Sequence, residues 1–187
     1  LGAVAFEAFT AHNLPDGVEP TLSAEATIDP QDFSFPHGTH LAAMEVDTET
    51  GKVTVRKYVC VDDVGVQVNP MIVEGQVHGG VAQGIAQALY EGANYDEDGQ
   101  PQNANLSTYL IPSAPDLPSF ITDTTCTPST TNPLGTKGVG EAGAIASTPA
   151  IINGIVDALR HLGVNDVLMP ATPMTVWKTI QAAQGGK

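Results

Sequence analysis

The sequence predicts an α+β fold, in which strands and helices follow one another without a regular βαβ alternation. Two observations lead to this prediction: a pair of β-rich segments joined by a tight turn, and longer segments with apolar residues at helical spacing. The chain has 187 residues, of which 42% are hydrophobic and 15% charged. This is enough for one compact domain, or for two small subdomains at about residues 1–65 and 66–187.

The first third of the chain is expected to contain a helix, a short strand and a hairpin. Residues 1–12 place apolar side chains on one side of a helix that ends at NLPDG. SAEATID (23–29) has the composition of a strand, and a loop rich in proline and phenylalanine follows from residue 30. THLAAMEVD and KVTVRKYVCVDD are typical of paired strands, because the intervening TETG offers Gly51 for the positive φ of a hairpin turn.

A helix is expected from about residue 70 to 90, where the apolar period changes from 2 to about 3.6. Asn69 is suited to cap this helix and Pro70 to occupy its first position. Each glycine inside it costs up to about 1 kcal/mol relative to alanine. Their missing Cβ atoms would let another backbone or a ligand approach closely. These glycines are Gly75, Gly79, Gly80 and Gly84.

The second half of the chain alternates between surface segments and helices. GANYDEDGQPQ (92–102) reads as a strand and a turn, and NLSTYLIPSAPDLPSFITDTTC (105–126) as extended segments interrupted by prolines. TPAIINGIVDALRHLG is a helix that Gly163 ends, and TPMTVWKTIQAAQ is a last helix with Thr172 as its cap. The residues of the first of these helices expected to face the core are Ile151, Ile152, Ile155, Val156 and Leu159.

Composition excludes some functions. Seven Lys and Arg against 21 Asp and Glu give a net charge of −14, so no basic face is available for nucleic acid. No uninterrupted apolar run reaches the roughly 18–20 residues of a transmembrane segment, and the N-terminus lacks the basic region of a signal peptide. Cys60 and Cys126 have no ligand-spaced partner, so we expect two buried free thiols and a cytoplasmic protein, with the periplasm as the alternative.

Glu141 is the first candidate for chemistry. It lies in GTKGVGEAG, four residues after Lys137 and near the start of a helix, where the helix dipole would stabilise a carboxylate by about 0.3–1 kcal/mol. A simple cap does not need so many glycines, and small or apolar neighbours favour a partly desolvated carboxylate. Its raised pKa would suit a general base. From the residues alone, the two interpretations are about equally supported.

A second candidate is EGQVHGGVAQGIAQ. Gln76, Gln83 and Gln87 share one helix face, and each amide carries both a donor and an acceptor for a heteroatom-rich ligand. The alternative is a packing helix with solvated glutamines. The histidines and aspartates show no metal-ligand spacing such as HExxH, so we expect no metal held by protein side chains. There is no phosphate loop and no GxSxG serine-hydrolase motif.

Together, VNP…EGQVHGGVAQGIAQAL and the later NPLGTKGVGEAG resemble the C-terminal part of the large, molybdenum-binding subunit of molybdenum hydroxylases. This family includes xanthine dehydrogenase, aldehyde oxidase and aerobic carbon monoxide dehydrogenase. The resemblance extends from FPHGTHLAAMEVDTETGKV to MPATPMTVWKTI. It implies a two-layer α/β sandwich of mixed strands and helices, with residues 1–187 forming the C-terminal portion of a molybdenum cofactor-binding domain.

The resemblance also implies residue roles. Glu141 would be the catalytic base, and molybdenum would be held by the dithiolene of its pterin. The cofactor would be molybdenum–molybdopterin, with the cytosine dinucleotide form as one option, and the reaction the oxidative hydroxylation of an aldehyde or an N-heterocycle. GEAGAIASTPAI is more similar to aldehyde oxidase-like and carbon monoxide dehydrogenase-like subunits, so carbon monoxide is an alternative substrate. The implied cofactor-binding residues are Gly75, Gln76, Lys137, Gly138, Val139 and Gly140.

Departures from the family pattern define the expected partners. The glycine–phenylalanine loop over the cofactor, the substrate-defining loop, the iron–sulfur cysteine motifs and a flavin-binding segment are not in this sequence. We therefore expect the chain to act with the remainder of the large subunit, a 2Fe-2S small subunit and an FAD medium subunit, and to be inactive alone. Two further hypotheses stay open: a catalytically silent interaction or scaffold domain of this fold, and a small-ligand-binding domain unrelated to molybdenum.

Overall fold

The computed structural model describes residues 1–29 and 32–185, which form two compact units, Leu1–Gln31 and Asp32–Lys187. The first unit contains helix α1, Gly2–Thr10. The predicted strand at 23–29 is wrong, since these residues have no regular structure and no strand partner to supply hydrogen bonds. The loop expected from residue 30 begins outside the described residues. The subdivision near residue 65 stays a prediction.

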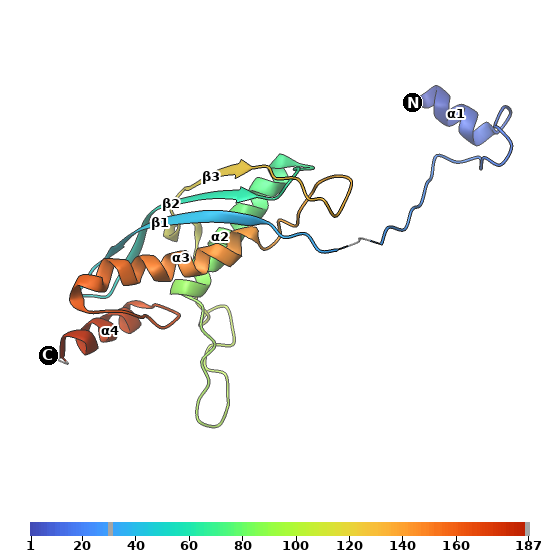
Figure 1. Ribbon diagram of the computed structural model, residues 1–187. Helices are drawn as coiled ribbons and strands as arrows, with labels where there is room; N and C mark the ends of the chain where they lie inside the picture. The colour runs from blue at the N-terminus through green and yellow to red at the C-terminus, as the bar shows by residue number, and fades with distance from the viewer. Residues whose placement is uncertain (30–31, 186–187) are drawn as a thin grey trace. The chain divides into compact units, whose positions relative to one another are not determined.

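A three-stranded mixed sheet organises the second unit (Figure 1). Strands β1, His37–Val46, and β2, Val53–Asp63, form the predicted antiparallel hairpin, and Gly51 adopts a φ of 74° in its turn. Strand β3, Phe120–Thr125, pairs in parallel with β2 and gives the order β1-β2-β3. Parallel pairing requires a long crossover between the two strands, and the crossover from β2 to β3 contains helix α2, Pro70–Leu89. The hairpin prediction is confirmed.

Helix α2 spans Pro70–Leu89, α3 spans Ala142–Leu159, and α4 spans Pro173–Gly185. Two short 3₁₀ turns, η1 (Ala114–Asp116) and η2 (Arg160–Leu162), complete the regular structure of the described residues. The predicted caps are confirmed: Asn69 accepts a hydrogen bond from the Ile72 amide, and Thr172 accepts one from the Thr175 amide. Helix α3 begins before its apolar pattern does, so that Glu141 is its N-cap residue.

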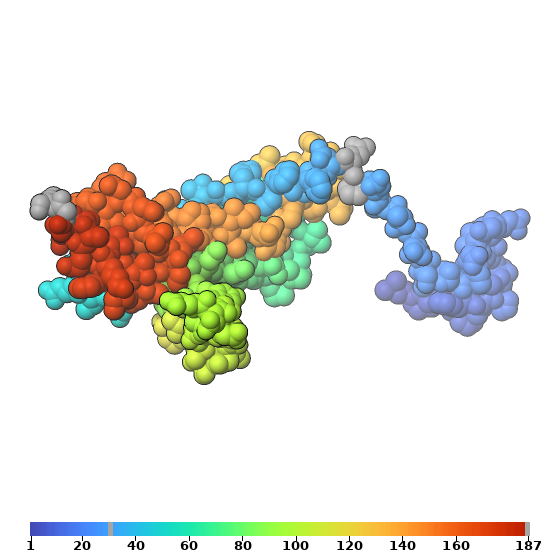
Figure 2. Space-filling model, turned by 90° about the horizontal axis from the view of Figure 1, so that it is seen from below, coloured from blue at the N-terminus to red at the C-terminus, as the bar shows by residue number. Residues whose placement is uncertain are grey.

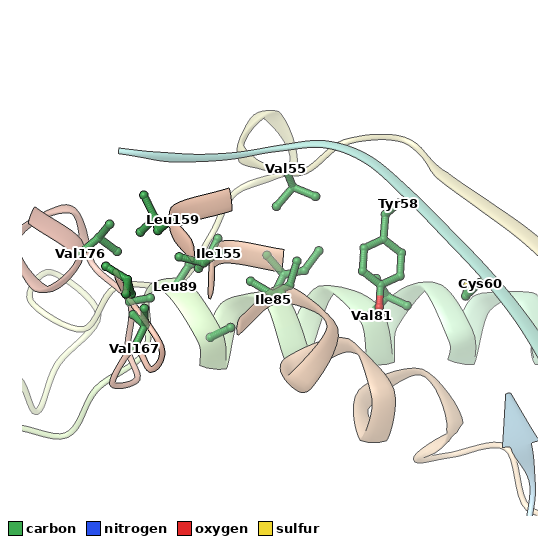
Figure 3. Close-up of a cluster of buried hydrophobic side chains, with 14 of the residues drawn as sticks. Val55, Tyr58, Cys60, Val81, Ile85, Leu89, Ile155, Leu159, Val167 and Val176 are labelled. Atoms are coloured by element: carbon green, nitrogen blue, oxygen red, sulfur yellow. The ribbon is translucent and has the colours of Figure 1, made fainter. Parts of the chain in front are cut away.

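Helices α2 and α3 cover one face of the sheet and bury a single large core between the two layers (Figures 1 and 3). Tyr58 projects into this core from β2, next to Val81 of α2. The core-facing prediction for α3 holds for its central stripe, whereas Ile152 and Val156 pack at the edge of the core and remain partly exposed. The buried stripe consists of Ile151, Ile155 and Leu159. The predicted α+β fold is confirmed.

The glycines of α2 divide into two pairs. A Cβ on Gly80 would lie 2.8 Å from the Ala144 amide nitrogen, and one on Gly84 would clash with the Ser147 side chain. These two glycines therefore allow α2 and α3 to touch through their backbones. A Cβ on Gly75 or Gly79 would meet nothing within 4 Å. That pair leaves an open strip of backbone on the surface of α2.

An arm that includes residues 92–109 projects from the end of α2 (Figures 1 and 2). The predicted strand within 92–102 is reduced to one isolated bridge between Tyr95 and Pro101, because the segment has no neighbouring strand. The predicted turn is present, with Gly99 at a φ of 78°. The arm forms an open pocket of about 350 Å³ lined by apolar, aromatic and amide side chains.

Within the described residues, one helical segment, Ala142–Leu162, is long and apolar enough to cross a membrane by length and composition. Here it packs against α2 and β1, as a core helix does.

Candidate functional site

The two sequence motifs meet where α2 crosses α3. A Cβ on Gly143 would lie 2.5 Å from the Val77 carbonyl oxygen, so the helices touch at this point. Gln76 precedes Gly80 by one turn and therefore lies on the same side of α2 as the crossing. Glu141 immediately precedes the first residue of α3. The crossing therefore brings Gln76 and Glu141 to one end of the helix pair.

Glu141 has its carboxylate free. As the N-cap residue of α3 it makes no side-chain capping hydrogen bond, and it is exposed. The expected desolvation is therefore wrong for this chain by itself, since no described residue covers the carboxylate. Glu141 still lies at the positive end of the α3 dipole, which favours a negative charge there. Its carboxylate is available to a group bound against this surface.

The backbone just before Glu141 is also exposed, and its amide groups have no protein partner among the described residues. A Cβ on Gly138 or Gly140 would meet nothing within 4 Å, and both glycines are exposed. In the part of the chain that the structure describes, the amide N–H groups of residues 138–141 donate to no protein acceptor. Successive free amides at a helix N-terminus attract anionic oxygen or sulfur. Together with Gln76, these donors suit an anionic, heteroatom-rich group such as molybdopterin, and the glycines leave room for its bulk.

Gln76, Gly75 and Gln83 are exposed on the surface of α2. Gln87 is also exposed but is committed within the protein, because its Oε1 accepts a hydrogen bond of 3.0 Å from Thr148 Oγ1 on α3. Among the described residues, the predicted glutamine face thus contains two amides without a protein hydrogen-bond partner and one that joins the two helices.

Lys137 points into the protein. Its Nζ lies 3.0 Å from Asp63 Oδ1, and the two side chains are only 9% and 1% exposed. The Lys137 amide also donates to the Val64 carbonyl at 2.9 Å, so the lysine is fixed at the end of β2 by backbone and side chain. Sequence reasoning named Lys137 but not its partner, because the two residues are 74 positions apart.

Asp63 is held in its charged form. Burial alone would raise its pKa, but hydrogen bonds from Lys137, the Gly65 amide and Thr125 outweigh burial and hold the pKa well below its usual range. His37 Nε2 lies 4.0 Å from the second carboxylate oxygen. A carboxylate with this many donors is a fixed anchor for the ammonium group of Lys137.

A second cluster of polar side chains lies on the face of the sheet that the helices cover. His40 Nδ1 is 2.7 Å from the Tyr58 hydroxyl, and its Nε2 is 3.2 Å from Asp62 Oδ1. Cys60 completes a set of atoms within 4.8 Å that has the composition of a metal site. Burial raises the pKa of the Cys60 thiol to about 11, so the thiol stays protonated near neutral pH. Cys126, expected to be buried, is exposed just after β3.

Comparison with known proteins identifies the family to which the chain belongs. The family model described as a molybdopterin cofactor-binding domain matches residues 3–118, which include Gln76. The chain is 39% identical to the carbon monoxide dehydrogenase large chain of Hydrogenophaga pseudoflava, over 97% of this chain and 22% of that protein. It is 38% identical to the nicotine 6-hydroxylase large subunit of Paenarthrobacter nicotinovorans, over 91% of this chain and 21% of that protein.

Solved structures agree. The Cu,Mo carbon monoxide dehydrogenase in its carbon monoxide-reduced state matches with a TM-score of 0.88 and 34% identity, over 97% of this chain and 22% of that one. Quinoline 2-oxidoreductase from Pseudomonas putida 86 matches with a TM-score of 0.85 and 40% identity, over 95% and 22%. The chain therefore spans about a fifth of the length of these relatives. The resemblance predicted from the two motifs is confirmed.

Proposed function

Because this chain belongs to the molybdopterin cofactor-binding domain family of molybdenum hydroxylase large subunits, we propose that it binds molybdenum–molybdopterin and supplies Glu141 as the general base of an oxidative hydroxylation. The crossing of α2 and α3 is the observation that carries the proposal. It places the free Gln76 amide and the free Glu141 carboxylate at one end of the helix pair. A catalytically silent scaffold has no need to keep both groups uncommitted on an open, glycine-lined surface.

Each residue of the site has a role that follows from its functional group. The Gln76 amide donates and accepts hydrogen bonds, and the backbone amides of Gly138, Val139 and Gly140 donate to anionic ligand atoms. When bound, the cofactor supplies the oxygen-transfer and electron-accepting chemistry of the hydroxylation. The Glu141 carboxylate, fixed at the start of α3, accepts the proton released in that reaction. Its place as the N-cap residue of α3, directly before the helix, limits its movement relative to Gln76.

An aldehyde or an N-heterocycle is the proposed substrate class. Carbon monoxide is the second candidate, favoured by the 39% identity to a carbon monoxide dehydrogenase large chain. The proposed assembly comprises the remainder of the large subunit, a 2Fe-2S subunit and an FAD subunit in the cytoplasm, with the cytosine dinucleotide form of the cofactor as one option. In that assembly the remainder of the large subunit covers Glu141 and provides the desolvation that this chain alone does not.

A single substitution tests the role of Glu141. In the assembled enzyme, Glu141→Gln should keep its molybdenum and pterin yet lower turnover by roughly 10²–10⁴-fold, the usual effect of removing a general base. Glu74→Gln, at an exposed position of α2, is the matched control and should leave turnover unchanged. Full activity in the Glu141→Gln enzyme would show that Glu141 is not the base.

A further inference from the structure

The buried ion pair between Asp63 and Lys137 has no part in the proposed chemistry. Because its side chains are only 1% and 9% exposed, it is not a chance surface contact. It joins the end of β2 to the loop that carries Glu141. We propose that Asp63 and Lys137 act as a positioning pair that fixes the loop before α3, and with it the Glu141 carboxylate, against the sheet. This inference rests on the proposed role of Glu141 and assigns Lys137 to the protein rather than to direct cofactor contact.

The backbone around the pair shows how closely the two segments are joined. Lys137 N–H donates to the Val64 carbonyl, and Val66 N–H donates to the Gly135 carbonyl, both at 2.9 Å. Gly65, with a φ of 66°, has no room for a Cβ, which would clash with the carbonyl oxygen of Gly135. The loop therefore runs directly against the end of β2 from residue 135 to 137.

Beyond Lys137 the loop has few other attachments. Gly138 and Gly140 touch nothing at their Cβ positions, and glycine backbones are conformationally permissive. Val139 packs against a small cluster formed by Val64, Val73 and Ala142. An apolar contact of this kind is not directional, whereas the ion pair fixes one atom of the loop against another. The last directional side-chain anchor before Glu141 is therefore Lys137.

The geometry of Asp63 makes this anchor rigid. Gly65 N–H and Thr125 Oγ1–H also donate to its carboxylate, at 3.0 and 3.1 Å, so the carboxylate cannot rotate to follow a moving lysine. Removing one charge leaves the other buried without compensation, whereas removing both leaves no unpaired charge. The pair should therefore behave as a unit, with a double variant milder than the product of its single variants.

The test uses the assembled enzyme with Asp63→Asn, Lys137→Met and the double variant. The asparagine substitution preserves the side-chain volume and an acceptor for the Gly65 amide, and the methionine substitution preserves most of the length of the lysine side chain. Glu45→Gln, which breaks the exposed Arg56–Glu45 pair on the same hairpin, is the control. Three quantities are measured: molybdenum and pterin content, kcat and KM, and hydrogen exchange of the amides over residues 134–141 and in β1.

Each single variant should lower kcat about 10–100-fold per bound molybdenum, with KM within about twofold, since a displacement of about 1 Å at a catalytic group has an effect of this size. Exchange should accelerate over residues 134–141 and remain unchanged in β1. The double variant should regain part of the lost kcat, and Glu45→Gln should match the unmodified enzyme.

Two results would overturn the positioning role. In the first, the single variants lose molybdenum in proportion to activity while kcat per molybdenum is unchanged, so that Lys137 holds the cofactor. In the second, exchange over 134–141 and kcat are unaffected, or the losses simply multiply in the double variant. If the unmodified enzyme contains no molybdenum, the proposed function fails instead, and exchange over 134–141 still decides whether the pair holds the loop.

Discussion

Alanine substitutions at Gly79 and Gly80 should have opposite effects on stability, although the two residues are neighbours in α2. In Gly80→Ala the new methyl would lie 2.8 Å from the Ala144 nitrogen and 2.9 Å from Gly143 Cα, both atoms of a packed helix backbone. Overpacking of this kind costs about 1–3 kcal/mol, against which alanine gains up to about 1 kcal/mol of helix propensity. With the full gain subtracted, the net loss is up to about 2 kcal/mol. In Gly79→Ala the methyl meets nothing within 4 Å, so only the gain of up to about 1 kcal/mol remains.

Urea-induced unfolding of the chain, followed by far-UV circular dichroism, measures the change in the free energy of unfolding for each variant, and thermal unfolding provides a second measurement. Thermal unfolding should show a Tm lowered by up to about 8 °C for Gly80→Ala and raised by up to about 4 °C for Gly79→Ala, given about 2–4 °C per kcal/mol for a domain of this size. If both variants shift the urea midpoint in the same direction, the close α2–α3 crossing is wrong. The placement of Gln76 and Glu141 at one end of the helix pair would then lose its structural basis.

Two other predictions concern single side chains. Gln76→Ala should reduce the molybdenum and pterin content of the assembled enzyme while leaving the fold intact. Gln83→Ala, at another exposed position of α2, is the control and should retain the cofactor. Equal cofactor contents in the two variants would show that Gln76 is not part of the site. In the native chain at pH 8 a thiol reagent should label Cys126 but not Cys60, because burial raises the pKa of Cys60 from 9.0 to about 11. Rapid labelling of both thiols at pH 8 would contradict the buried position of Cys60. The raised pKa also makes the free energy of unfolding depend on pH: the contribution of the protonated Cys60 is complete below pH 9 and is lost as the pH rises to about 11.

Local signals account for the elements that the sequence predicted well. The TETG turn between two β-rich runs and the Asn69–Pro70 start of α2 are determined by neighbouring residues, and both are present. The strand expected at 23–29 had a suitable composition but no partner strand, and hydrogen-bonding partners are a property of the whole fold.

The candidate site shows the same division. Its two motifs were recognisable from their residues, and the glycine pattern indicated a close approach that the structure confirms at Gly80. The pattern could not distinguish Gly80 from its neighbour Gly79, because only the position of α3 determines which of them is covered. Likewise, Asp63 and Lys137 meet across 74 residues through the pairing of β2 with the loop before α3, and no local signal in the sequence indicates that pair.

We propose that the surface formed by Gln76 and Glu141 binds a molybdenum–molybdopterin cofactor. The most direct test is the molybdenum and pterin content of the complex purified with its native partner subunits. The complex should contain molybdenum and pterin in equal amounts, close to one of each per chain, and both should decrease in the Gln76→Ala complex. A complete complex that contains neither molybdenum nor pterin would show that this surface does not bind the cofactor.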